Sequence, residues 1–257
     1  MRTPAEAASA AAALLVAVCA VAAAAAPNEL PSTFKLCHRS QPDVAQCLTD
    51  AFQSAIPELK KGLPAFGVYS IDPLKVTQML IDQGDGPVNI KLDFTDQTFT
   101  GFGDITVKDL KVNLDPDNFH IDAKVSIPNL DLKGKYQIDG KVLVLPIQGK
   151  GNSDLTLKDV LCDVVMTGEP VEKSGEKYVN IKDFKINFET SRLYLTFENL
   201  FNGDKALGDN MNNFINENWD VILKELKPGI SDVLGAIFQD ISNRIFSKVP
   251  YDKIFLP

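Results

Sequence analysis

The sequence predicts an α+β fold in which an antiparallel sheet curls around one long C-terminal helix. Between residues 88 and 201, apolar and polar residues alternate with a period of two, which is typical of strands with one buried and one solvated face. Between residues 203 and 247 the apolar residues recur at spacings of three and four, which indicates a helix. A helix of roughly 44 residues would reach ~65 Å, and only a sheet of similar length can bury its apolar face. A rod inside a curled sheet leaves a long internal hollow.

The first 26 residues have the pattern of a signal peptide. Arg2 supplies a weakly basic start, and residues 7–26 are almost unbroken Ala, Leu and Val. Proline is a poor residue just after a cleavage site, so we expect cleavage shortly before Pro27. An uncleaved anchor is the alternative, because the run is just long enough to span a bilayer, although alanine makes it a weak span. We therefore expect a signal peptide over 1–26, an extracellular location, and a single domain over 27–257.

Two helices are expected ahead of the strands. The first covers residues 42–61, where apolar residues follow the helical spacing, and Pro57 is expected to kink or stop it. The second is short and begins at Asp72, an N-cap residue followed by Pro73 at the first helical position. It is expected to end at the glycine-rich turn over 84–87. The apolar residues of this second helix are Leu74, Val76, Met79 and Leu80.

The alternating region predicts an antiparallel meander, because strand follows strand without an intervening helix. Turns are expected at 115–118, 149–152 and 168–175, where Gly, Pro, Asn and Asp cluster. The long helix that follows is expected to kink or break at Pro228 and Gly229. The expected strand segments are Val88–Phe94, Leu110–Leu114, Phe119–Ile127, Tyr136–Val142, Val160–Met166, Phe184–Phe188 and Leu193–Phe197.

Composition and motifs argue against several classes of function. A net charge of −8 disfavours a nucleic-acid partner, and no second apolar run is long enough for stable membrane insertion. His38 and His120 have no zinc-ligand or catalytic spacing around them, and the lone G-F-G at 101–103 indicates a turn or bulge. The acidic and amide residues between Asp204 and Asn213 are better explained by helix capping than by calcium binding. We expect no catalytic residue, no metal site and no cofactor.

The cysteines favour one disulfide. Of four cysteines, Cys19 leaves with the predicted signal peptide. An oxidising destination favours a bridge between Cys37 and Cys47 across a short polar loop, worth roughly 3 kcal/mol in the chain-entropy model. Cys162 is then unpaired, and a buried small apolar residue is a better interpretation of it than a reactive thiol.

Three segments resemble the takeout and juvenile-hormone-binding protein family of insects, and the similarity covers essentially the whole chain after residue 26. The segments are LPSTFKLCHRS at 30–40 closing with Cys47-Leu48, NLFNGDKALGD at 199–209 followed by NNFINENW at 212–219, and LVLPI at 143–147.

The resemblance implies a tubular lipid-binding fold, in which a strongly curved antiparallel sheet wraps a long helix and encloses an elongated apolar tunnel. Family members are small secreted carriers of juvenile-hormone-like terpenoids or other lipophilic molecules, and several are connected with feeding or circadian output. The family's N-terminal disulfide would fall on Cys37 and Cys47. Juvenile-hormone carriers of haemolymph have a second bridge, for which only Cys162 remains here. This departure favours the takeout branch and makes juvenile hormone itself a doubtful ligand.

We therefore expect a non-enzymatic, monomeric carrier that holds a small elongated hydrophobic ligand, such as a terpenoid or a fatty acid. The alternative is an extracellular signalling protein of the same fold that acts through its outer surface, and a receptor is left open as a further partner. An enzyme acting on the lipid is the weakest hypothesis. The residues expected to line the ligand site are Tyr136, Met166, Phe214, Trp219, Ile222, Phe238 and Ile241.

Overall fold

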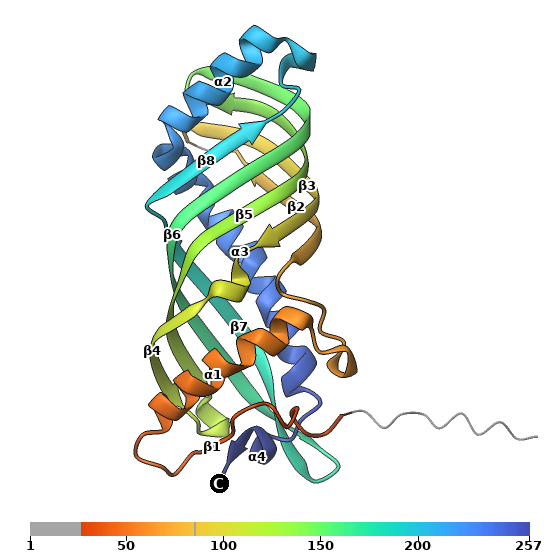
Figure 1. The fold of residues 1–257 in the computed structure, drawn as a ribbon, viewed down its shortest axis with the longest axis vertical. Coiled ribbons are helices and arrows are strands. Elements are labelled where there is room, and N and C mark those ends of the chain that lie inside the picture. Colours follow the sequence, from red (N-terminus) through yellow and green to blue (C-terminus); the bar gives the residue numbers. More distant parts are fainter. Residues whose placement is uncertain (1–26, 85) are drawn as a thin grey trace, which may run out of the picture.

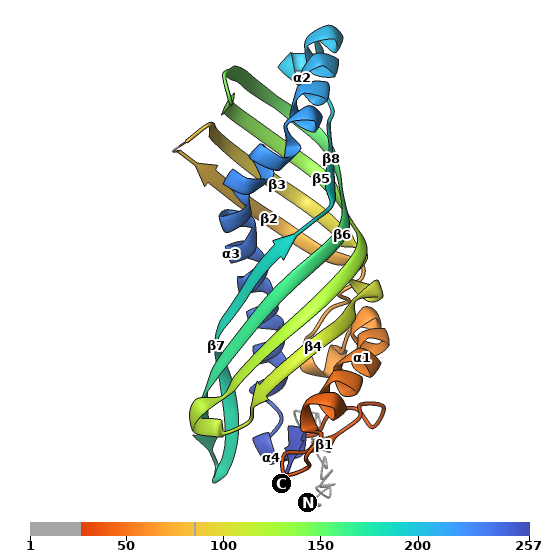
Figure 2. The same cartoon turned by 90° about the vertical axis from the view of Figure 1, so that its left-hand side faces the viewer.

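The computed structural model describes residues 27–84 and 86–257, so the predicted signal peptide lies outside the described residues. The body is elongated, and a curved sheet wraps a long helix, α3, along most of its length (Figure 1). In a view turned by 90°, the strands run obliquely along the body and α3 occupies the open side of the sheet (Figure 2). The predicted α+β class, with a curved antiparallel sheet around a C-terminal helix, is confirmed.

The seven-stranded sheet is organised around two long strands, β5 and β6, which pair along their whole shared length. On the other side of β5, its first part pairs with β4 and its second part with β3. On the other side of β6, residues 153–158 pair with β8 and residues 161–173 pair with β7. The strands of this sheet are β2 Leu74–Gln83, β3 Val88–Thr100, β4 Thr106–Asn113, β5 His120–Val142, β6 Leu145–Lys173, β7 Glu176–Glu189 and β8 Arg192–Phe197.

Four α-helices complete the fold of the described residues, and the break in the long C-terminal helix is not where the sequence predicts it. The break lies at Asn218, where the backbone leaves the helical conformation. The side-chain amide of Asn218 donates to the Phe214 carbonyl at 2.8 Å. Pro228 and Gly229 lie inside α3, which is continuous across them and packs along its length against β7 and β2. The helices are α1 Val44–Lys61, α2 Lys205–Glu217, α3 Trp219–Phe246 and α4 Tyr251–Ile254. Short 3₁₀ turns are Pro64–Phe66, Phe102–Asp104, Pro116–Asn118 and Phe201–Gly203.

The short helix predicted after Asp72 is wrong, because these residues form strand β2. Leu74, Val76 and Met79 are buried on its inner face, and Leu74 pairs with Phe99 of β3. The carboxylate of Asp72 does not cap a helix; it accepts the backbone N–H groups of Gly101 and Gly103, at 3.2 and 2.9 Å. Tertiary pairing with β3 therefore overrides the local capping signal.

Two of the predicted turns are also displaced. The turn at 115–118 is confirmed, since Pro116–Asn118 forms a 3₁₀ turn. Residues 149–152, by contrast, lie inside β6, where glycine allows another part of the chain to approach: a Cβ on Gly151 would lie 2.4 Å from the Glu198 carbonyl oxygen. The third turn narrows to Ser174 and Gly175, and the chain before it continues as strand with a bulge at Gly168.

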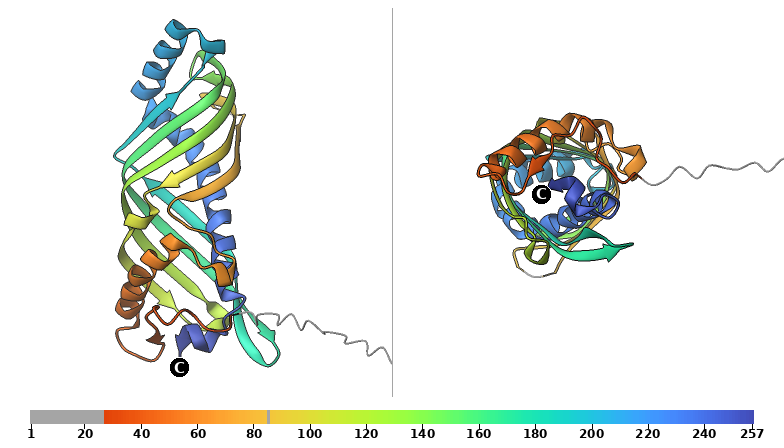
Figure 3. Two further views of the ribbon diagram at one scale, coloured as in Figure 1. Left: turned by 45° about the vertical axis from the view of Figure 1, so that its right-hand side comes forward. Right: turned by 90° about the horizontal axis from the view of Figure 1, so that it is seen from below.

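Helix α3 closes the gap between the two edges of the sheet, β2 and β7 (Figure 2). The edge of β7 is paired by a side chain, because the amide of Asn243 accepts the Ile181 N–H at 2.8 Å and donates to the Ile181 carbonyl at 3.0 Å. Viewed from below, the helices and the curved sheet form a ring (Figure 3). The sheet is therefore closed by side chains of helices rather than by a strand.

The same kind of pairing protects two other edges. On β8, the amide of Asn212 both accepts from and donates to the backbone of Phe197 at 2.9 Å. On β4, the amide of Gln53 in α1 donates to the Ile105 carbonyl at 2.9 Å and accepts the Val107 N–H at 3.0 Å. Each amide replaces a neighbouring strand, so the exposed backbone groups of an edge are satisfied and shielded.

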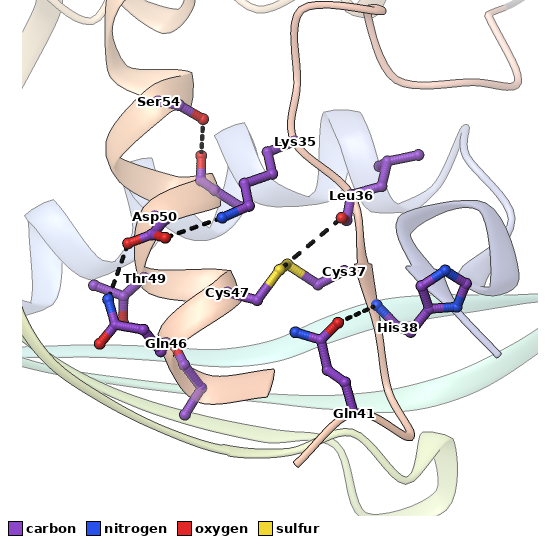
Figure 4. Close-up of a disulfide and its surroundings, with 12 residues drawn as sticks. Lys35, Leu36, Cys37, His38, Gln41, Gln46, Cys47, Thr49, Asp50 and Ser54 are labelled. Atoms are coloured by element: carbon purple, nitrogen blue, oxygen red, sulfur yellow. Dashed lines mark hydrogen bonds and ion pairs between the residues drawn. A yellow bond between two sulfur atoms is a disulfide. The ribbon is translucent and has the colours of Figure 1, made fainter. Parts of the chain in front are cut away.

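The predicted disulfide between Cys37 and Cys47 is confirmed, with Cα atoms 6.0 Å apart (Figure 4). It joins strand β1, Cys37–His38, to helix α1. Strand β1 in turn pairs in parallel with β9, Phe255–Leu256, at the end of the chain. The bridge thus connects the N-terminal segment, α1 and the C-terminal segment at one end of the body (Figure 3).

Replacing both bridge cysteines, Cys37→Ala together with Cys47→Ala, should lower the free energy of unfolding by roughly 2.5 kcal/mol, because a short loop is no longer closed in the unfolded chain. Urea denaturation of the oxidised protein and the double variant measures the difference. Cys162→Ala, which leaves the bridge intact, is the control. A double variant as stable as the parent would contradict the role of this bridge.

Replacing Asn212 by Ala should cost about 2 kcal/mol of stability, because a backbone N–H and a carbonyl of β8 lose their partner. The matched control is Asn213→Ala, since the neighbouring Asn213 is exposed and a change there should stay within about 0.5 kcal/mol. Both are read from urea denaturation midpoints. Equal midpoints for the two variants would show that the amide does not protect the edge.

Candidate functional site

An apolar cavity of about 350 Å³ lies between the inner face of the sheet and helices α1 and α3. Its lining side chains are hydrocarbon, apart from thioether sulfur, the Ser242 hydroxyl and the Cys162 thiol. Two strands supply much of the wall. The residues are Ile121, Ala123, Val125, Ile127, Leu130 and Leu132 of β5, and Leu155, Leu157, Val160, Cys162, Val164 and Met166 of β6.

The register between β5 and β6 creates this wall. Directly paired residues of an antiparallel sheet point to the same face, and the period of two repeats this at every second pair. Ala123 therefore lies beside Val164, and Val125 lies beside Cys162, all four on the cavity side. The intervening residues, such as Lys124, carry the charges on the outer face.

Aromatic side chains of α3 form part of the opposite wall. The ring of Phe238 lies 5.4 Å from that of Phe102 in an edge-to-face arrangement and 5.9 Å from that of Phe184 in a stacked one. These contacts hold Phe238 in place between one ring from the 3₁₀ turn Phe102–Asp104 and one from β7. Helix α1 contributes Phe52 and Ile56 to the same cavity.

Three of the residues expected to line a ligand site lie at this cavity. They are Met166 on β6, and Phe238 and Ile241 on α3. Strand alternation for Met166 and helical spacing for Phe238 and Ile241 correctly suggest that these side chains point inward, but neither the contribution of α1 nor that of Phe94 and Phe99 on β3 was expected. Whether any of them contacts a ligand stays a prediction.

The other four expected residues lie away from the cavity. Tyr136 is buried, its hydroxyl donates to the Glu198 carbonyl at 2.7 Å, and this burial raises the pKa of its phenol to about 12. Ile222 is buried in the main apolar core, and Phe214 and Trp219 pack against that core. Tyr136, Trp219 and Ile222 lie on elements that line the cavity elsewhere, whereas Phe214 lies on α2, which contributes no lining residue. Periodicity alone does not say which part of a long core is hollow.

Comparison with known proteins identifies the family. The family model for haemolymph juvenile hormone binding protein matches residues 14–256. The chain belongs to this juvenile-hormone-binding protein family. The expectation drawn from the motifs around Cys37, Asn199 and Leu143 is therefore confirmed.

Relatives within the juvenile-hormone-binding protein family resemble the chain over most of its length. The circadian clock-controlled protein daywake of Drosophila melanogaster is 29% identical, with 88% of each chain covered. The "Putative beta-carotene-binding protein" of Schistocerca gregaria is 23% identical, over 84% of this chain and 85% of that protein. The crystal structure of Epiphyas postvittana Takeout 1 superposes with a TM-score of 0.75 at 27% identity, covering 87% of this chain and 100% of the other.

Residues 27–84 and 86–257 of this family member contain no group of three His, Cys, Asp or Glu side chains that could hold a metal ion. None of the described helices is long and apolar enough to cross a membrane.

Cys162 is the one thiol among the cavity-lining residues, and its surroundings keep it neutral. It is unpaired and partly buried. Burial, with a smaller contribution from the charge of Asp163, raises the pKa of the thiol to about 11. Because the thiolate is the nucleophile, Cys162 behaves at neutral pH as a small apolar part of the wall.

The raised pKa predicts slow alkylation of Cys162. At pH 8, iodoacetamide should modify it about 100-fold more slowly in the folded protein than in urea, where the thiol returns to its ordinary pKa. The rate for the folded protein should rise about tenfold per pH unit between pH 8 and 10, because the thiolate fraction grows below the pKa. Mass spectrometry of protein beginning at Pro27, with its bridge intact, gives both rates. Equal rates in the two conditions would contradict a buried, neutral thiol.

Proposed function

We propose that the protein is a secreted, non-enzymatic carrier that binds a small elongated hydrophobic ligand in its internal cavity. The observation that carries the proposal is the cavity of about 350 Å³ with an almost wholly apolar wall. Concave apolar cavities of this size are typical ligand sites, and leaving one unfilled costs dispersion contacts.

Burial of apolar surface supplies enough free energy for such binding. Removing on the order of 400 Å² of ligand surface from water gives ~10 kcal/mol before losses. Association entropy takes back at least about 4 kcal/mol. The remaining ~6 kcal/mol corresponds to a Kd on the order of tens of micromolar, which is reached without any ion pair.

The chemistry of the wall limits the ligand class. The residues that line the cavity include no Lys, Arg, His, Asp or Glu, so a neutral terpenoid or fatty-acid-like chain is the preferred cargo. The family's description as juvenile hormone binding proteins, and the carotenoid named for the locust relative, support a lipophilic terpenoid. Juvenile hormone remains one candidate within this class.

Secretion and a monomeric single domain belong to the same proposal. The disulfide supports an oxidising compartment, which agrees with the signal-peptide pattern over 1–26. One continuous seven-stranded sheet and the pairing of β1 with β9 support a single unit over 27–257.

Filling the cavity should abolish binding. The proposal predicts that N-phenyl-1-naphthylamine binds the wild-type protein with micromolar affinity and is displaced by terpenoids or fatty acids. Ala123→Trp, which places an indole in the cavity wall, should weaken probe binding at least about tenfold because the ring occupies ligand space. Fluorescence titration measures both effects.

The matched control for that variant is the next residue. Lys124 is exposed on the outer face, so Lys124→Trp should leave probe affinity unchanged. A flat titration across several ligand types, or equal losses in the two variants, would argue against an internal carrier site. Native mass spectrometry of protein purified from cells is the second test. If it detects only protein without a bound lipid, the alternative of a signalling protein acting through its outer surface is favoured.

A further inference from the structure

Two polar side chains interrupt the apolar interior of the sheet. Among the described residues, Gln97 and Ser153 are the polar side chains that are buried, with exposed fractions of 1% and 3%. Both point to the inner face, Gln97 from β3 and Ser153 from β6. A buried amide is costly in an apolar interior unless each of its polar atoms has a partner.

The backbone is shaped to accommodate the amide of Gln97. At a bulge in β3, Asp96 and Gln97 oppose the single residue Gly134 of β5, and Asp96 has a φ of 52°. A Cβ on Gly134 would lie 2.5 Å from the Gln97 amide nitrogen, so glycine leaves the room that the amide occupies. Gly134 pairs in turn with Ser153.

The amide is satisfied on one side only. Its nitrogen donates to the Lys135 carbonyl at 2.8 Å and lies 3.5 Å from the Ser153 hydroxyl oxygen. Its oxygen is buried and has no hydrogen-bond partner. The assignment of the two atoms follows from the contact, because turning the amide over would place its oxygen against the Lys135 carbonyl. Gln97 therefore offers an unused acceptor inside the molecule.

This acceptor lies beside lining residues at one end of the apolar cavity, and neither Gln97 nor Ser153 is itself a lining residue. Along β5 the lining ends at Leu132, and along β6 it ends at Leu155, each two residues from Gly134 and Ser153. On β3 the lining residues Phe94 and Phe99 flank Gln97. Beyond this layer no residue of β5 or β6 is among the lining residues, and the ring of Tyr136 packs 4.6 Å from that of Phe197.

We propose that the oxygen of Gln97 binds a hydrogen-bond donor at the end of the ligand, so that the preferred cargo is a linear apolar chain with a terminal hydroxyl. The inference rests on the carrier function proposed above and narrows its ligand class. A ligand that fills the cavity to this end brings its terminal group to the layer of Gln97 and Ser153. A hydroxyl donates to the unpaired oxygen. An ionised carboxylate offers no donor and meets no cation among the lining residues.

The test compares dodecan-1-ol with 1-methoxydodecane, which has the same alkyl chain but no donor, as competitors of N-phenyl-1-naphthylamine. The wild-type protein should bind the alcohol about fivefold to tenfold more tightly than the ether, as expected for one hydrogen bond to a buried acceptor. In Gln97→Met, which keeps a similar shape and removes the acceptor, the two affinities should become equal through loss of alcohol binding alone. Unchanged ether affinity in this variant shows that the cavity is intact.

Ser242→Ala is the matched control, because Ser242 is the hydroxyl residue in the cavity lining. Its hydroxyl bonds to the Phe238 carbonyl at 2.8 Å, and the alcohol preference should persist in the variant. Equal affinities in the wild-type protein, or a preference lost in Ser242→Ala and kept in Gln97→Met, would overturn the inference while leaving the carrier function standing. Failure of the probe and both competitors to bind the wild-type protein would overturn the carrier function, and the inference with it.

Discussion

An antiparallel sheet that curls without meeting itself has free edges, and the arrangement of this protein follows from how those edges are closed. Amide side chains of helices bond to the edge backbone: Asn243 on β7, Asn212 on β8 and Gln53 on β4. An amide presents one donor and one acceptor at the spacing of a peptide group, so it can end a ladder without adding a strand. Because helices complete the ring, the inner face of the sheet lies opposite a helix. The two surfaces differ in shape and do not interdigitate as the faces of two packed sheets do. The cavity lies along this mismatch.

The size of the inward-facing side chains explains why the interior is hollow in one part and filled in another. Near α2, the ring of Phe197 packs against those of Tyr136 and Phe94, and Phe94 also borders the cavity. Farther along, β5 and β6 present smaller residues such as Ala123 and Val164 to the cavity. The transition falls at Gly134, where the chain has no side chain at all and a glutamine takes the space. Side-chain size along two paired strands therefore sets where the interior is hollow.

Much of the architecture could be predicted from the sequence, because its periods are long and unbroken. The alternation through β5 and β6 and the helical stripe after residue 203 specify a curved sheet on a helix, and family motifs specify the bridge between Cys37 and Cys47. The errors arise where distant contacts outweigh local signals. Asp72 resembles a helix cap but bonds to the backbone of Gly101. The glycines near residue 150 resemble a turn but make room for a crossing chain.

The candidate site was harder to predict than the fold. Periodicity identifies inward-facing residues, but both a packed core and a cavity wall consist of such residues, so Tyr136 and Phe238 are indistinguishable in the sequence. Their difference depends on what lies opposite each one, and this is a property of the packed chain. The inward position of Gln97 could likewise not be predicted from alternation. The bulge in β3 adds one residue to the strand, and this shifts Gln97 from the outer to the inner face.

The meeting of the two chain ends has a practical consequence. Strands β1 and β9 pair beside the disulfide at one end of the elongated body, whereas α2 and the hairpin between β5 and β6 form the opposite end (Figure 1). A tag or surface linker attached at Leu256 or beyond would hold the molecule by one end of its elongated body. The opposite end, with α2 and the hairpin between β5 and β6, would then face the solution, which makes the protein well suited to oriented immobilisation.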